Sequence, residues 1–133
     1  MTWVAGQMPN KIEVPTVGTA TYDGHVVANV RNGGGAQYVA SGNMINTIDF
    51  ARRSGTAQVT GFDGANYTGT LLLDRQDPRY LGAGLSSAVG NRTMIMTGNL
   101  FRGTQGPVGE MGGNVLVGGT NYLGSGIFPG KLR

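Results

Sequence analysis

The chain has 133 residues, of which 39% are hydrophobic, 13% are charged and 25 are glycine, and its formal net charge is +3. This length makes a single domain with a core, and the charge is too small to indicate nucleic-acid binding. Cysteine is absent, which excludes disulfides, thiolate metal sites and a cysteine nucleophile, and no apolar run is long enough for a transmembrane helix.

Alternation of apolar and polar residues with a period of two runs through most of the chain and predicts β-strands. In the stretch around residues 38–50, for example, Tyr38, Met44 and Ile48 share one face, while Asn43 and Thr47 share the other. Segments rich in Gly, Asn, Asp and Pro separate these runs and predict turns. The predicted strands cover residues 17–31, 37–51, 54–62, 66–74, 78–88, 92–102, 113–118 and 122–131.

The short turns between these strands predict an antiparallel meander. Closing the first strand onto the last removes both exposed edges, and at eight strands the interior is just wide enough for side chains to fill. We therefore predict an all-β fold, a single eight-stranded antiparallel up-and-down β-barrel with a filled interior, over residues 17–133. Residues 1–16, which contain Pro9 and Pro15, are predicted to be an extended N-terminal segment outside the barrel.

A tyrosine followed two positions later by a glycine occurs at Tyr22, Tyr67, Tyr80 and Tyr122. Glycine lacks Cβ and permits strong local bending, and a tyrosine two residues away lies on the same face and leans over it. We interpret this pattern as a device for barrel curvature, so Gly24, Gly69, Gly82 and Gly124 are predicted to lie in strands. A surface for stacking a ligand is the alternative interpretation.

Three stretches resemble the transferrin-binding-protein-like β-barrel. Residues 106–132 (GPVGEMGGNVLVGGTNYLGSGIFPGKL) resemble its closing hairpin, residues 17–30 (VGTATYDGHVVANV) its opening strand, and residues 46–62 (NTIDFARRSGTAQVTGF) its central Asp-Phe hairpin. This barrel occurs in surface lipoproteins of Gram-negative bacteria. The resemblance implies a cell-surface, outer-membrane-associated or secreted protein that binds or adheres without catalysis.

Two groups of residues deserve comparison with catalytic or metal sites. His25, the single histidine, shares a strand face with Asp23, but no nucleophile accompanies the pair, so we expect both on the barrel exterior. Asp74 and Asp77 flank the turn DRQDP without the spacing of a calcium loop. The sequence therefore predicts no enzyme, no catalytic residue, no metal site and no cofactor.

The arginines form the one candidate binding site. Alternate turns of an up-and-down barrel lie at the same end, so the second, fourth and sixth turns bring together five arginines: Arg52, Arg53, Arg75, Arg79 and Arg102. One interpretation is a rim for docking an acidic partner or a neighbouring domain. The other is a structural rim of ion pairs to Asp49, Asp74, Asp77 and Glu110.

The predicted function is a surface-exposed or secreted binding module whose partner is a protein, either from a host, from the envelope or in an adjacent domain. The alternative is an assembly domain that packs against copies of itself or a neighbouring domain, which the low charge and the Thr- and Asn-rich outer faces favour. Neither nucleic acid nor a transmembrane segment is expected.

Overall fold

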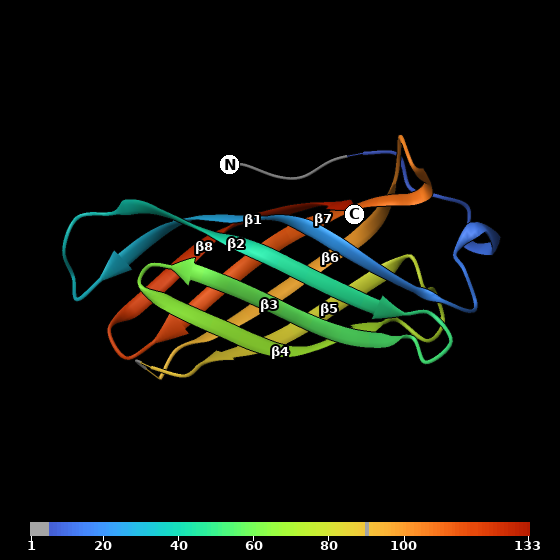
Figure 1. The fold of residues 1–133 in the computed structure, drawn as a ribbon. Helices are drawn as coiled ribbons and strands as arrows, with labels where there is room; N and C mark the ends of the chain where they lie inside the picture. Colours follow the sequence, from blue (N-terminus) through green and yellow to red (C-terminus); the bar gives the residue numbers. More distant parts are fainter. Residues whose placement is uncertain (1–5, 90) are drawn as a thin grey trace.

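A computed structural model describes residues 6–89 and 91–133 and contains one closed antiparallel barrel in which every strand pairs with its sequence neighbours and β1 pairs with β8 (Figure 1). The predicted all-β, eight-stranded barrel is confirmed. The strands are β1 (Thr19–Asn32), β2 (Tyr38–Asp49), β3 (Ser54–Phe62), β4 (Ala65–Leu73), β5 (Tyr80–Ser87), β6 (Thr93–Gly103), β7 (Gly106–Gly119) and β8 (Tyr122–Leu132).

Tight turns with left-handed backbone connect several neighbouring strands. Asp63 and Gly64 form a two-residue link between β3 and β4, with φ values of 49° and 78°. Positive φ at both residues matches the twist of the paired strands, and Asp followed by Gly adopts it at low cost. Asn121, between β7 and β8, has a φ of 52°. The Asp, Asn and Gly residues used to predict the turns therefore have a direct conformational role.

Side chains from all eight strands fill the interior of the barrel. The largest fully buried ones are Tyr22, Tyr67, Phe62, Phe128, Met44, Ile48, Leu71, Met94, Met96, Leu100, Met111 and Val26. Burial alternates along the strands, as in β4, because successive side chains point to opposite faces. Among the described residues, Asn46 is the one buried polar side chain, and its amide nitrogen lies 3.4 Å from the sulfur of Met44 and 3.3 Å from that of Met111.

The sequence prediction was wrong about where the seventh strand begins. The sequence pattern ends one strand at residue 102 and begins the next at residue 113, but β7 starts at Gly106 and pairs with β6 from there onward. The glycines in this stretch allow neighbouring backbones to approach closely. A Cβ on Gly113 would collide with the Thr97 carbonyl of β6, so here glycine permits the close approach of two strands and does not mark a loop.

The four glycines of the Tyr-x-Gly pattern all lie in strands, as predicted. Gly24 and Gly69 support the curvature interpretation, because a Cβ on either would collide with a carbonyl of the adjacent strand. The third pair, Tyr80 and Gly82, differs, and the predicted role in barrel curvature is wrong for it. Tyr80 points outward and is 45% exposed, and a Cβ on Gly82 would meet the Met96 carbonyl oxygen only at an ordinary contact distance of 3.7 Å.

Residues 6–18 precede the first strand and run along the outside of the barrel at the end where the C-terminus also lies (Figure 1). They include η1 (Lys11–Glu13), a single 3-10 turn. Gly6 lies over the ring of Phe101, which points outward from β6 yet is buried. The remaining residues of the predicted N-terminal segment, 1–5, lie outside the described residues. Within residues 6–89 and 91–133, no helix is long and apolar enough to cross a membrane.

Candidate functional site

Most charged side chains gather at one end of the barrel, which we call the charged end. It is formed by the β2–β3, β4–β5 and β6–β7 turns, the N-terminal segment and the C-terminus (Figure 1). The five predicted arginines lie there. This end holds all of the ten Lys and Arg residues except Arg31 and Arg92. It also holds all of the seven Asp and Glu residues except Asp63. Eight cations against six anions leave the charged end with a net charge of +2.

Two of the predicted arginines hold the N-terminal segment against the barrel. The guanidinium of Arg102 pairs with Glu13, and its backbone N–H donates to the Gln7 carbonyl at 2.7 Å. Arg79 pairs with Asp77 at 2.7 Å and donates to the Pro9 carbonyl at 3.5 Å. These side chains are partly buried, so their first role is structural. Glu13 was not among the expected partners, since nothing in the sequence indicates that the segment folds back.

The other three arginines lie at the tips of their turns. Arg52 has a side chain that is 82% exposed and makes a loose ion pair of 3.7 Å with Asp49. Arg53 donates from its guanidinium to the carbonyl of Arg75 at 2.6 Å, which joins the β2–β3 and β4–β5 turns. Arg75 is itself exposed. Of the five predicted arginines, Arg52 and Arg75 are therefore the two that are exposed to solvent.

The acidic residues that were compared with catalytic or metal sites have structural roles. Asp74 accepts hydrogen bonds from the backbone N–H groups of Gln76 at 2.8 Å and Asp77 at 3.0 Å, which is the geometry of an Asx turn. His25 is exposed on the outer face of β1, as expected. Asp23 lies on the same face and pairs with the C-terminal residue Arg133 at 2.8 Å.

A second polar cluster closes the opposite end of the barrel. One carboxylate oxygen of Asp63 accepts hydrogen bonds from the hydroxyls of Tyr38 and Tyr122, both at 2.6 Å. The guanidinium of Arg92 lies 3.8 Å from the centre of the Tyr122 ring and donates to the Asp63 carbonyl at 3.3 Å. These four residues come from the four loop regions at this end. The cluster therefore joins all four connections.

The electrostatics of this cluster favour an ionised Asp63. Partial burial alone would raise the pKa of Asp63, but hydrogen bonds from Tyr122 and Tyr38 and the charge of Arg92 outweigh it and hold the pKa below the ordinary value. Burial, followed by the hydrogen bond to Asp63, raises the pKa of the Tyr122 hydroxyl, which therefore stays protonated as a donor. Sequence reasoning missed this cluster, because its members are far apart along the chain.

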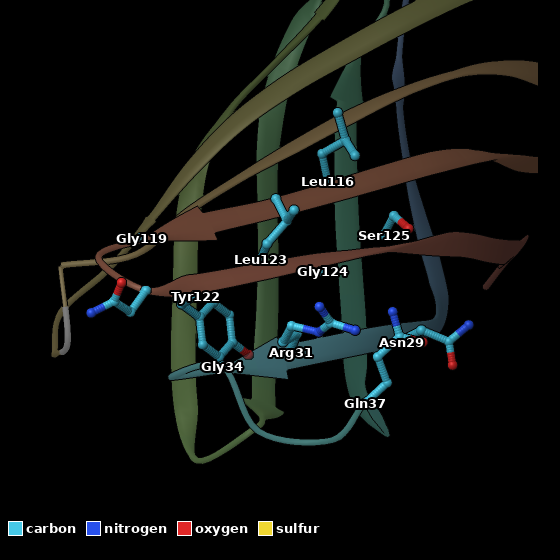
Figure 2. A pocket seen from close by; sticks show the side chains of 11 residues that line it. Asn29, Arg31, Gly34, Gln37, Leu116, Gly119, Tyr122, Leu123, Gly124 and Ser125 are labelled. Atoms are coloured by element: carbon cyan, nitrogen blue, oxygen red, sulfur yellow. The ribbon is translucent and has the colours of Figure 1, made fainter.

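A shallow hollow of about 710 Å³ lies on the outer wall toward this end, where β7, β8 and β1 adjoin (Figure 2). It continues along the wall into a second hollow, with which it shares Asn29, Leu116 and Ser125. We call the combined surface the outer-wall groove and define it by Val27, Asn29, Leu116, Leu123, Ser125 and Ile127. Leu116 and Leu123 are more than half exposed, which makes the groove apolar.

The outer-wall groove was also missed, although the sequence contained a signal for it. Inward residues of β7 and β8, such as Val115 and Phe128, are buried, so the alternation places Leu116 and Leu123 outward. Large apolar side chains at outward positions of adjacent strands make an exposed apolar patch. Because the barrel interior is occupied by side chains, this molecule offers ligands its outer wall and its ends.

Comparison with known proteins gives a structural relationship and no relationship by sequence. No family model and no curated protein sequence matches the chain. Among solved structures, transferrin-binding protein B from Haemophilus parasuis superposes with a TM-score of 0.74 at 14% identity, over 96% of this chain and 29% of that one. A surface lipoprotein superposes with a TM-score of 0.72 at 14% identity, over 96% of this chain and 66% of the other.

The haemoglobin receptor HpuA from Kingella denitrificans, solved in complex with human haemoglobin, superposes with a TM-score of 0.60 at 19% identity. That match covers 95% of this chain and 48% of HpuA. The chain thus spans less than two thirds of each of these proteins. At these identities the likeness establishes the fold, and the resemblance to transferrin-binding-protein-like barrels is confirmed at that level. These structural neighbours are binding proteins and a surface lipoprotein.

Proposed function

We propose that this chain is a non-enzymatic protein-binding barrel, displayed at the surface of a Gram-negative bacterium or secreted from it, and that the charged end contacts its partner. The observation that carries the proposal is the division of the molecule into a filled interior and an exterior with eight of its ten Lys and Arg residues at one end. A barrel that binds another protein needs an accessible surface, and it does not need an enclosed substrate site.

The charged end suits an acidic protein surface. Arg52 and Arg75 stand at the tips of two adjacent turns, and the Arg53 hydrogen bond holds those turns together. Arginine forms paired hydrogen bonds to carboxylates, so two fixed turn tips present a geometry that suits docking. The partner is a protein from a host, from the bacterial envelope or in an adjacent domain. That HpuA and transferrin-binding protein B share the fold makes host proteins the first candidates.

The test uses immobilised full chain in biolayer interferometry, with human haemoglobin and human transferrin as the first probes and solubilised envelope proteins as the next. For a protein that binds, the double variant Arg52→Glu, Arg75→Glu should weaken binding by about tenfold or more. Each substitution replaces an attractive exposed ion pair with a repulsive contact, which costs on the order of 1 kcal/mol of binding free energy. Added salt should weaken binding as well.

The matched control is Arg31→Glu at the opposite end, which should leave partner binding unchanged. Thermal melting of the double variant should stay close to that of the wild type, because neither arginine is held in a buried ion pair. A partner bound equally well by wild type and double variant would contradict the charged end as the contact surface.

A second candidate function, assembly through packing against copies of the same chain, is favoured by one specific observation. The outer-wall groove is apolar and lies away from the charged end.

A further inference from the structure

The outward residues of β1 run from an acid to a base with an apolar residue midway. Successive outward positions are Asp23, His25, Val27, Asn29 and Arg31, and all five are exposed. Asp23 and Arg31 each lie four residues from Val27, or about 13 Å along the strand. They are therefore about 26 Å apart within one chain, too far for a direct interaction.

We propose that the outer-wall groove is the contact surface of a homodimer, in which two barrels pack wall to wall with antiparallel β1 strands about a twofold axis at Val27. A twofold axis there makes Val27 face its own copy and places Arg31 of each chain opposite Asp23 of the other. The arrangement forms two equivalent ion pairs between chains. A surface with its acid and base at equal distances from an apolar centre is complementary to itself.

The middle of this surface is suited to burial. Val27 lies directly beside Ile127 of β8 and beside Ser41 of β2. Val39 and Leu116 lie level with Asn29, and Leu123 lies beside Arg31, so this apolar surface extends from the centre toward Arg31; the three side chains are 68%, 55% and 66% exposed. The six residues that define the groove are uncharged, and the charged Arg31 that also lines it would face Asp23 of the second copy, so packing two copies together desolvates apolar surface while this charge is paired.

Its polar groups also match a second copy. About a twofold axis at Val27, Asn29 of each chain lies opposite His25 of the other, and a side-chain amide can donate to or accept from an imidazole. Asp23 already accepts from Arg133 in the same chain, but that pair is half exposed on both sides. A carboxylate offers about four lone-pair positions, so it can accept from Arg31 of the second copy as well.

The available area suits a weak dimer. The wall from β7 to β2 is about 19 Å wide, and the span from Asp23 to Arg31 is about 26 Å long, giving roughly 500 Å² in projection before side-chain relief is added. A standard interface buries about 800 Å² per partner, close to one ninth of the 7339 Å² surface of this chain. The wall thus approaches that requirement, and we expect dissociation constants in the micromolar range.

Sedimentation velocity of the full chain over a range of concentrations tests the dimer. The wild type should shift from monomer to dimer as concentration rises. Leu116→Asp should weaken self-association by at least about tenfold, because it places a charge in the apolar contact. The matched control is Leu72→Asp on β4, at the opposite wall, where Leu72 is 57% exposed; it should dimerise like the wild type. A wild type that remains monomeric up to roughly 1 mM would overturn the proposal.

A charge exchange tests the twofold arrangement itself. Arg31→Asp alone and Asp23→Arg alone should each weaken self-association, since like charges then face each other. Mixing these two variants should give a heterodimer more stable than either homodimer, because each pair then joins opposite charges. Thermal melts followed by circular dichroism identify any variant that fails to fold. If a charge variant does not fold, the comparison of Leu116→Asp with Leu72→Asp still tests the dimer. A mixture that associates no better than the separate variants would overturn the arrangement. None of these results depends on partner binding at the charged end.

Discussion

The hydroxyl of Tyr122 donates a 2.6 Å hydrogen bond to the carboxylate of Asp63, and this bond joins the start of β8 to the turn between β3 and β4. Asp63 receives a second such bond from Tyr38 at the start of β2. A single turn residue thus connects strands from three sides of the barrel mouth. Because the residue is held in left-handed backbone, its carboxylate has a fixed direction.

Asp63→Asn is expected to destabilise the barrel by about 1–3 kcal/mol, because charge-assisted hydrogen bonds from both tyrosines lose their ionised acceptor. Chemical denaturation at neutral pH measures this change. Asp49→Asn is the control, since the ion pair of Asp49 with Arg52 is exposed and the amide oxygen of Asn can still accept the backbone hydrogen bonds from Ala51 and Arg52, so it should change stability by less than about 0.5 kcal/mol. Equal effects of the two substitutions would contradict the role assigned to the cluster.

The same carboxylate predicts how stability depends on pH. Its pKa is lowered on folding, so below the ordinary value of 3.8 the unfolded chain binds more protons than the folded one. The contribution of Asp63 is therefore complete above about pH 4 and is lost as pH falls further. Denaturation midpoints measured from pH 7 down to acid should show the stability difference between wild type and Asp63→Asn shrinking below that pH. A constant difference would show that ionisation is irrelevant.

Arg79 should control the ionisation of Asp77. Hydrogen bonds from Arg79 to its carboxylate lower the pKa of Asp77 to about 2. Substitution of Arg79 by Gln removes the charge and most of those bonds, so the pKa of Asp77 should rise toward 3.8. Carbon-detected NMR titration of the carboxyl group measures it directly. An unchanged pKa would mean that the ion pair does not persist in solution.

Gly69→Ala should destabilise the barrel by roughly 2 kcal/mol or more, because the added Cβ would collide with the carbonyl of Gly84 on the adjacent strand. The matched control is Gly84→Ala, where the added methyl meets nothing within 4 Å. That substitution should be neutral or stabilise by up to about 1 kcal/mol through the unfolded state. Thermal melts of both variants compare the two sites, and similar losses would argue against the close strand approach at Gly69.

The fold was predictable because its determinants are local. Alternating burial, such as Tyr67 inside and Thr68 outside, and turn residues such as Asp63 and Gly64 are visible in the sequence. The start of β7 was not predictable, since glycine serves equally for a turn and for a close approach of two strands. At Gly113 that ambiguity is resolved only by the neighbouring Thr97 backbone.

The candidate site was predictable only in outline. Topology alone places the five arginines at one end, because alternate turns of a meander share an end. Their division into anchoring and exposed residues was not predictable. It depends on Glu13 and Pro9, which reach Arg102 and Arg79 only because the N-terminal segment runs back across the barrel. Contacts of this kind between distant parts of the chain leave no periodic signal.

The most direct test of the central claim, recognition by the outside of a filled barrel, is an NMR titration of labelled full chain with a protein that it binds. Backbone amides and methionine methyl groups are recorded together, since Met94 and Met96 report on the interior and Arg52 and Arg75 on the charged end. We expect shifts or broadening of the signals from the β2–β3 and β4–β5 turns, with the signals of the interior methyl groups unchanged. Shifts of the Met94 and Met96 methyl groups with both turns silent would contradict the central claim.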